Sequence, residues 1–279
     1  IYQTTLEAGR AEIQRRFEAG EQSGTQTVHA GAYLIDQLVR IIFEVATEHV
    51  YPLGVDISAD RMSVVATGGY GRAELAPHSD IDLMFLLPYK LTPQTEQVVE
   101  YVLYTLWDLS LKVGHATRSA EEAVRLSKED ITIRTSLLES RLITGNEEQF
   151  ANFHSLFHQD VVSDTGMAFV EAKLAERDAR HARMGDTRYV LEPNIKDGKG
   201  GLRDLQTLMW IAKYLYGVES IGDLKQKGVL TNDDARRFEK AQEFLWTVRC
   251  HLHYLADRPE ERLTFNVQTE IGERMAYTD

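Results

Sequence analysis

The sequence predicts an α+β fold, in which a small sheet with flanking helices is followed by an all-helical domain. Two short strand-like runs, residues 61–67 and 80–87, lie on either side of a glycine pair. Residues 32–51 instead repeat their apolar side chains at helical spacing. Beyond residue 118 the segments favour helix almost throughout. We therefore expect an α/β domain with N-terminal helices over residues 1–118 and a helical domain over residues 119–279.

Periodicity and chain-breaking residues define the elements expected in the first domain. A polar break at Gln22–Thr27 precedes the helix over residues 32–51, which Pro52 and Gly54 end. The apolar face of that helix consists of Leu34, Ile35, Leu38, Ile41, Ile42 and Val45. A helix over residues 94–109 and a third strand over residues 111–118 follow the two strands beside the glycine pair.

Helices are the only regular elements expected in the second domain. Ser119 followed by Glu122 has the pattern of a capping box, which begins a helix. The stretch Tyr189–Gly201 is rich in glycine and interrupts the helical pattern. The expected helices cover residues 119–127, 129–142, 146–160, 165–184, 203–217 and 231–257.

Composition limits the classes of function. The formal net charge of −12 disfavours a nucleic-acid-binding protein, because phosphate backbones need a basic surface. The single cysteine, Cys250, excludes a disulfide framework. No apolar run approaches the roughly 20 residues of a membrane span, and no signal-peptide pattern opens the chain. We expect a cytoplasmic protein, and Ile1 in place of Met leads us to expect a piece of a longer one.

Two acidic residues on the second strand are the first candidates for chemistry. Side chains alternate between the faces of a strand, so Asp80 and Asp82 project together from the face opposite Ile81, Leu83 and Phe85. Like charges side by side repel each other, and a divalent cation relieves that repulsion. Carboxylate oxygens suit Mg²⁺. The pattern therefore predicts a magnesium site at Asp80 and Asp82.

The glycine pair before this strand is a candidate phosphate cradle. Gly68 and Gly69 lack a Cβ atom, so their N–H groups can approach phosphate oxygens closely. Arg72 can add a charge-assisted contact to a triphosphate, and Ser79 a hydroxyl. Alone, a glycine pair is usually a plain turn, and Asp-x-Asp is usually a solvated strand edge. Their combination predicts nucleotidyl transfer.

These residues resemble the DNA polymerase β-like nucleotidyltransferase superfamily, which has a Gly-Gly or Gly-Ser turn followed by Asp-x-Asp on the next strand. Within it, GGYGRAELAPHSDIDLMFL, residues 68–86, is similar to the catalytic motif of the bacterial PII uridylyltransferases. Ala73 departs from the family's usual glycine, which is tolerable if the backbone there is not left-handed.

A second block, LEPNIKDGKGGLRD at Leu191–Asp204, is similar to the LEPNIK–GGLRD segment of the same family, and a related form occurs in adenylyltransferases of glutamine synthetase. It is a glycine-rich loop leading into a helix N-terminus, where anions are favoured. Lys196 and Arg203 are candidates for contacts to nucleotide phosphates, and Asp204 for capping the helix. A purely structural loop is an equally good interpretation.

A third carboxylate is implied by the superfamily, as a metal ligand or general base. Asp108 is the first candidate, because it precedes the expected third strand, and Glu139 is the second. His115 on that strand is better explained as a structural histidine. His251 and His253 are spaced i,i+2 on a helix and face apart, which argues against a metal pair.

The resemblance implies transfer of UMP from UTP to a tyrosine of the PII nitrogen-signalling protein, with release of pyrophosphate and Mg²⁺ as cofactor. Members of the family are multifunctional, with a uridylyl-removing domain that contains a His-Asp pair, and with ligand-sensing domains. No His-Asp dipeptide occurs in this sequence, so we expect transfer without removal. The alternatives are an adenylyltransferase acting on glutamine synthetase or another protein, a non-catalytic nucleotide-sensing module, and an antibiotic nucleotidyltransferase.

Overall fold

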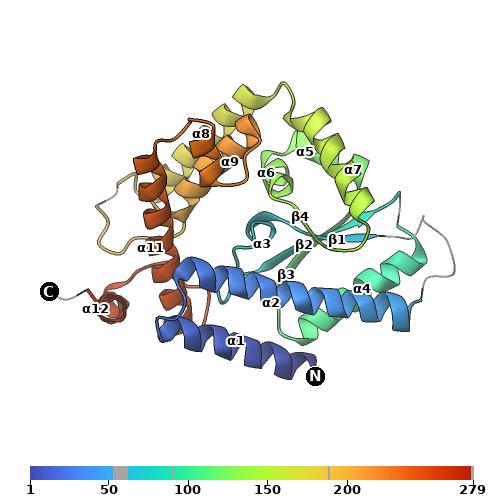
Figure 1. The fold of residues 1–279 in the computed structure, drawn as a ribbon, viewed down its shortest axis with the longest axis horizontal. Coiled ribbons are helices and arrows are strands. Elements are labelled where there is room, and N and C mark those ends of the chain that lie inside the picture. The colour runs from blue at the N-terminus through green and yellow to red at the C-terminus, as the bar shows by residue number, and fades with distance from the viewer. Residues whose placement is uncertain (53–61, 90, 188, 278–279) are drawn as a thin grey trace. The chain divides into compact units, whose positions relative to one another are not determined.

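The computed structural model describes residues 1–52, 62–89, 91–187 and 189–277, which form two compact units (Figure 1). The first unit comprises Ile1–Arg10, His29–Leu75 and Ser79–Asp164, and the second comprises Ala11–Val28, Ala76–His78 and Thr165–Asp279. This division differs from the one predicted at residue 118, because the sheet continues beyond that point.

A mixed four-stranded sheet forms the centre of the first unit, in the order β3-β2-β1-β4. Its strands are β1 (Ser63–Ala66), β2 (Ile81–Leu87), β3 (Val113–Ser119) and β4 (Arg141–Thr144). β1 pairs antiparallel with β2 and β4, whereas β2 and β3 are parallel. The three predicted strands are confirmed, although the predicted start of the first, Arg61, lies outside the described residues. The expectation of helices alone after residue 118 was wrong, because β4 begins at Arg141. The helix predicted over residues 129–142 is present as Ile131–Leu138 but ends before this strand.

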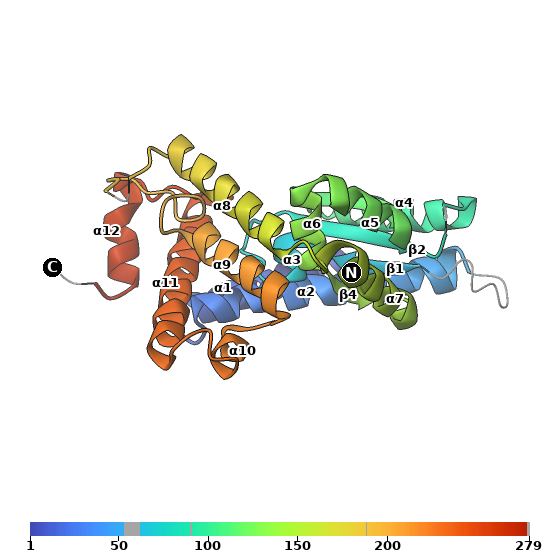
Figure 2. The ribbon, with the colours of Figure 1, turned by 90° about the horizontal axis from the view of Figure 1, so that it is seen from above.

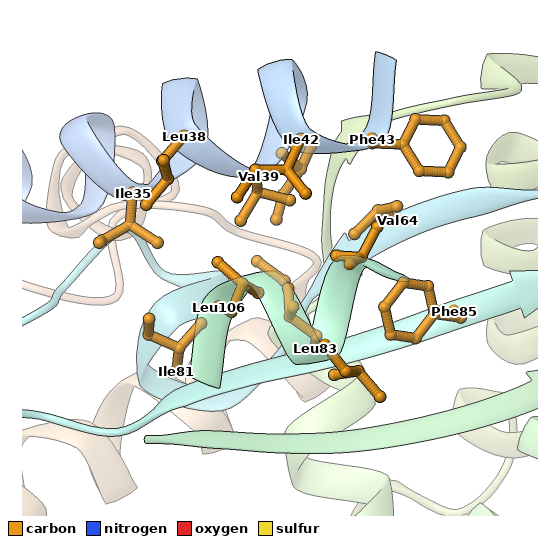
Figure 3. Packing of buried hydrophobic residues seen from close by; sticks show 14 of the residues in the cluster. Ile35, Leu38, Val39, Ile42, Phe43, Val64, Ile81, Leu83, Phe85 and Leu106 are labelled. Carbon is orange, nitrogen blue, oxygen red and sulfur yellow. The ribbon is translucent and has the colours of Figure 1, made fainter. Parts of the chain in front are cut away.

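One face of the sheet packs against α2 (Gly24–Val45) and α4 (Pro93–Asp108). Figure 3 shows the α2 side chains facing the strands. The packed residues labelled there are Ile35, Leu38, Val39, Ile42, Phe43, Val64, Ile81, Leu83, Phe85 and Leu106. Ile35, Leu38 and Ile42 lie on it as the sequence predicted, and so does the apolar face of the second strand. Ile41, predicted on the same helix face, is instead 48% exposed. A π-helical turn, Ala46–Val50, continues α2 before Pro52, while the predicted stop at Gly54 lies outside the described residues.

Helices on the opposite side of the sheet follow β3 in the sequence (Figure 1). They are α5 (Ala120–Glu129), α6 (Ile131–Leu138), α7 (Glu147–Phe157) and the π-helical turn His158–Val162. Ser119 caps α5 by accepting a hydrogen bond from the Glu122 N–H at 3.2 Å, as its sequence pattern predicts. Met84 and Leu86 of β2 are buried beneath this layer, so the sheet is covered on both faces beyond its first residues.

The second unit is built from helices. Besides parts of α1 (Tyr2–Glu18) and α2, it contains α8 (Gly166–Arg183), α9 (Leu202–Tyr216), α10 (Ile221–Gln226), α11 (Asn232–Ala256) and α12 (Phe265–Arg274). α8 and α9 lie side by side in both ribbon views (Figures 1 and 2), where the rings of Phe169 and Tyr214 stack with centroids 3.8 Å apart. No helix in the described residues is long and apolar enough to cross a membrane.

A tertiary contact, and not the local sequence, determines where α2 begins. The polar stretch Gln22–Thr27 was predicted as a break, yet α2 begins within it, at Gly24. Glu243 of α11 accepts hydrogen bonds from the N–H groups of Gly24 and Thr25, at 2.6 and 3.1 Å, and from the Ser23 hydroxyl, at 2.9 Å. Because the first N–H groups of a helix have no partner within it, this carboxylate provides the missing acceptors.

Candidate active site

Asp80 and Asp82 lie where the sequence predicts them, at the beginning of β2. Ile81 and Leu83 are buried in the core, and the alternating Asp80 and Asp82 are exposed on the other face. The backbone of Asp82 is fixed by its pairing with β1, where the Thr67 N–H donates to the Asp82 carbonyl oxygen at 3.0 Å. The strand therefore presents two carboxylates to one side.

The glycine turn lies directly beside one of these carboxylates. Gly68 adopts a φ of +58°, which favours glycine, and begins the single helical turn α3 (Gly68–Gly71). A Cβ atom on Gly68 would be 3.4 Å from Asp82 Oδ2. The N–H groups of Gly68 and Gly69 belong to the first turn of α3, where a helix offers them no acceptor. The two halves of the motif are thus neighbours in space, as predicted.

Gly114 of β3 closes the other side of the Asp82 carboxylate, and the sequence analysis missed it. In the parallel pairing of β2 and β3, Gly114 lies opposite Asp82. A Cβ atom on Gly114 would be 2.7 Å from Asp82 Oδ1, closer than side-chain atoms approach one another. The carboxylate therefore occupies space that only glycine leaves. A glycine inside a predicted strand is a known sign of close approach and was the available signal.

Ser136 of α6 is a second residue that the sequence did not reveal. Its Oγ would be 3.8 Å from the same Cβ position on Gly68 that lies 3.4 Å from Asp82 Oδ2. A half-buried hydroxyl thus lies close to the turn, next to the same glycine as the carboxylate. Nothing in the local sequence of a helix signals this proximity, because α6 reaches the site only through tertiary packing.

Arg72 is held in a network of carboxylates at the end of α3. Its Nε is 2.7 Å from Glu74 Oε2, and its Nη1 is 3.4 Å from Glu139 Oε2. Burial opposes the charged form, but the two carboxylates outweigh it and raise the pKa of Arg72. A Cβ atom on Gly71 would collide with the Glu139 carbonyl oxygen, so α3 also packs closely on the end of α6. Arg72 thus braces the turn, and its contact to a triphosphate stays a prediction.

The predicted third carboxylate does not join the other two. Asp108 is the exposed last residue of α4, and Glu139 is buried with Arg72. Within the described residues, no three His, Cys, Asp or Glu side chains gather closely enough to hold a metal ion, so Asp108 does not form such a group with Asp80 and Asp82.

Ser79 and Ala73 lie in the loop between α3 and β2. Ser79 is half-buried and immediately precedes Asp80, which leaves its predicted role in the cradle untested. Ala73 has a φ of +58°. The condition under which alanine was expected to be tolerated there is therefore not met, and the residue carries the strain of a left-handed backbone.

Lys196 and Arg203 belong to the second unit, where the Leu191–Asp204 block folds into a compact loop. The Asn194 side chain accepts hydrogen bonds from the N–H groups of Lys196 and Asp197, at 3.0 and 2.6 Å. Lys196 Nζ is 3.9 Å from Glu261 Oε1, and Arg203 Nε is 3.4 Å from Asp197 Oδ1. Burial and the nearby Arg249 lower the pKa of Lys196.

Asp204 does not cap α9 as predicted, because Gly201 is the N-cap residue and Asp204 lies in the first turn, from which it binds the preceding loop. Its Oδ2 accepts a hydrogen bond from the Gly200 N–H at 2.8 Å, just before α9 begins. It also binds Arg180 and His181 of α8, at 2.5 and 2.9 Å. One carboxylate thus joins the loop, α9 and α8.

The rings of the remaining histidine candidates, His115, His251 and His253, pack against other aromatic rings. The His115 ring packs edge-on against Trp107, with centroids 6.0 Å apart. The His251 ring contacts Phe17, with centroids 4.5 Å apart, whereas the His253 ring lies 6.1 Å from that of His78. His251 and His253 thus face different partners, in agreement with the argument against a metal pair.

The space around Asp82 fits a hard divalent cation. The donors are carboxylate oxygens, which Mg²⁺ prefers, and those of Asp82 lie beside two glycines whose Cβ atoms would fill the adjoining space. Asp80 projects from the same face of β2 and can supply a further oxygen. Asp80 and Asp82 are therefore suitable ligands for Mg²⁺.

Comparisons with known proteins find relatives of this chain. Residues 168–279 match the family model described as GlnD PII-uridylyltransferase. Over all 279 residues the chain is 57% identical to the bifunctional uridylyltransferase/uridylyl-removing enzyme of Rhodospirillum rubrum, of which it covers 30%. It is 59% identical to the enzyme of that name from Azospirillum brasilense and 49% identical to that from Novosphingobium aromaticivorans, each over 98% of the chain and 29% and 30% of the relative. The chain thus spans about 30% of the length of the curated relatives it matches.

Proposed function

This chain belongs to the family of bifunctional uridylyltransferase/uridylyl-removing enzymes, and on that premise we propose that it transfers UMP from UTP to a tyrosine hydroxyl of the PII signalling protein. In the reaction the tyrosine oxygen bonds to the α-phosphorus, the bond to pyrophosphate breaks, and the hydroxyl proton leaves. The proposal includes action in the cytoplasm, on a protein and a nucleotide rather than on nucleic acid.

One observation carries the proposal: the Asp82 carboxylate lies between Gly68 and Gly114, beside the turn that starts α3. A structural aspartate has no need of two neighbouring residues without side chains. A carboxylate that must keep one orientation toward a ligand does, because a Cβ atom on either glycine would crowd its oxygens.

The proposed magnesium ion is bound by Asp80 and Asp82. When bound, it neutralises negative charge on the triphosphate and on the leaving pyrophosphate. The acidic net charge of the chain does not oppose the binding of UTP, because the metal supplies positive charge at the site.

The chain's own groups bind and orient the triphosphate in this proposal. The N–H groups of Gly68 and Gly69 donate to phosphate oxygens, with Arg72 and the Ser79 hydroxyl as further donors. Arg72 keeps its contacts with Glu74 and Glu139, which hold its guanidinium in place. Its positive charge attracts the triphosphate from that fixed position. The phosphate contacts expected of Lys196 and Arg203 from the sequence stay a prediction.

Replacing Asp82 with Asn tests the proposal, because the amide keeps the shape of the carboxylate and removes its charge. We expect transfer of labelled UMP to PII to fall at least about a hundredfold, equivalent to about 2.7 kcal/mol of activation free energy. Asp160→Asn is the matched control, since that carboxylate pairs with Lys128 on the surface and should be dispensable. Normal incorporation by a folded Asp82→Asn protein would contradict the proposal.

The choice of nucleotide needs a separate assay, because the proposed cradle contacts phosphates and not the base. With PII as acceptor, we expect incorporation from UTP and little from ATP. Faster incorporation from ATP, or into glutamine synthetase, would favour the adenylyltransferase alternative.

A further inference from the structure

The three residues Ala76–His78 belong to the second unit, although the chain on both sides of them belongs to the first. Ala76 is buried in an apolar cluster of that unit, with Trp246 and Cys250 of α11. The His78 side chain faces the same helix, with its Nε2 3.6 Å from Asp257 Oδ1. We call residues Ala76–His78 the strap. It is fixed to the second unit only two residues before Asp80.

His253 of α11 holds the backbone of the strap. It is fully buried, at 0% exposure, and its Nδ1 accepts a hydrogen bond from the His78 N–H at 3.4 Å. That bond requires the ring proton to be on Nε2, which faces Glu261 Oε1 at 3.6 Å. Burial lowers the pKa of His253, which favours the neutral ring whose Nδ1 can accept this bond.

A buried ion pair fixes the group that the His253 ring faces. Arg249 lies one helical turn before His253, and its Nη2 and Nε donate to the two Glu261 oxygens at 2.6 and 2.9 Å. Burial opposes the charged form of Glu261, but His253 and Arg249 outweigh it and lower the pKa of this carboxyl to about 2. The Arg249 guanidinium also lies over the Trp246 ring, 5.1 Å from its centroid. Arg249 therefore fixes the carboxylate that His253 Nε2 faces at 3.6 Å.

Asp80 depends on backbone anchors for its position. Within the described part of the chain its exposed carboxylate makes no hydrogen bond or ion pair. On its C-terminal side the Ile81 N–H donates to the Lys112 carbonyl oxygen at 2.9 Å. On its N-terminal side the strap is the nearest anchor, and two residues of chain span at most about 7 Å.

We propose that His253 is a positioning residue for Asp80: by accepting the His78 N–H it fixes the chain that leads to this metal ligand. This inference rests on the proposed role of Asp80 and Asp82 in binding Mg²⁺. It gives His253 a purpose that its sequence spacing did not suggest.

Replacing His253 with Asn or with Gln distinguishes the effect of its hydrogen bond to the His78 N–H from the effect of side-chain packing. The Asn oxygen can occupy the position of Nδ1, whereas the Gln amide reaches the position of Nε2 and leaves the His78 N–H without an acceptor. We expect His253→Gln to weaken Mn²⁺ binding, measured by electron paramagnetic resonance, about tenfold, while His253→Asn stays within about threefold of the parent. The Mg²⁺ concentration for half-maximal UMP transfer should shift in parallel, with the KM for PII unchanged.

His251→Gln is the matched control, since this neighbouring buried histidine packs on Phe17 and does not contact the strap. We expect parent-like Mn²⁺ binding from this variant. Should His253→Gln fail to fold, His78→Pro removes the donor in place of the acceptor and should cause the same shift of about tenfold.

Parent-like Mn²⁺ binding by folded His253→Gln would overturn the inference. So would equal losses in the Asn and Gln variants with equal drops in melting temperature, because that pattern indicates packing alone. Asp80→Asn and Asp82→Asn, measured alongside, distinguish a failure of the positioning role of His253 from a failure of the proposed metal site. If those two variants bind Mn²⁺ normally, the proposed metal site itself is wrong.

Discussion

Two glycine-rich segments of this protein, one in each unit, use their glycines for different purposes. In the first unit, Gly68 and Gly114 leave space that the Asp82 carboxylate occupies, with Cβ positions 3.4 and 2.7 Å from its oxygens. That carboxylate is exposed on its strand. The oxygens of this carboxylate are therefore accessible to a ligand.

In the second unit, the glycines of the Leu191–Asp204 loop leave space for the loop's own backbone. A Cβ atom on Gly201 would be 2.6 Å from the Ile195 carbonyl oxygen, and one on Gly198 would be 2.5 Å from that of Asn194. The Leu202 and Arg203 N–H groups donate to the carbonyls of Ile195 and Lys196. Similar composition thus serves a site in one unit and packing in the other, and only the neighbouring atoms distinguish them.

Gly114→Ala should have the largest effect on this comparison. The new methyl group would meet the end of the Asp82 side chain, which can rotate away at little cost to stability. We expect the free energy of unfolding to change by less than about 1 kcal/mol, while UMP transfer falls about a hundredfold, or about 2.7 kcal/mol. Denaturant unfolding and the labelled-UTP assay measure the two quantities.

The control for Gly114→Ala is Gly272→Ala in α12, where a Cβ atom would meet nothing within 4 Å. It should leave both transfer and stability close to those of the parent. If Gly114→Ala retained full activity, Asp82 would not need its present orientation, and the contrast between the two segments would be lost.

Gly201→Ala should have the opposite profile. Its Cβ would press on three backbone carbonyl oxygens that cannot move independently, so we expect a loss of about 1–3 kcal/mol in unfolding free energy. UTP affinity of the folded protein, measured by calorimetry well below its melting temperature, should stay near the parent value. Weakened UTP binding at unchanged stability would instead make the loop a ligand-binding element.

Ala73→Gly should have the smallest effect, and it should be favourable. Glycine relieves the left-handed strain at φ +58° but has more freedom in the unfolded chain, so a net stabilisation of about 0.5–1 kcal/mol is expected. A thermal melt measures it. A destabilised Ala73→Gly protein would show that the alanine methyl, which packs against the apolar core of the first unit, matters more than the strain.

The strands and the two aspartates were predictable because alternation is a local property. Ile81, Leu83 and Phe85 face α2 and α4, and Asp80 and Asp82 face away, as a period of two residues requires. The pairing of the glycine turn with Asp82 was also predictable, since a short connection between neighbouring strands brings the two ends together.

Other features depend on residues distant in sequence and could not be predicted locally. α2 begins at Gly24 because Glu243 supplies acceptors more than 200 residues away, and β4 forms because Arg141–Thr144 finds an open edge of β1. Arg141 is further held by Asp36, whose carboxylate accepts two hydrogen bonds at 2.8 and 3.1 Å. Neither a propensity nor a periodicity contains that information.

The sequence by itself determined that two carboxylates share one face of a strand next to a glycine turn, because backbone geometry alone imposes that arrangement. Only the tertiary structure decided what surrounds them. Gly114 and Ser136 approach the site from β3 and α6, and His253 contacts the strap from α11. Packing between distant segments determines these neighbours, because it lowers the free energy of the whole fold. The sequence of any one segment contains no periodic pattern that predicts them.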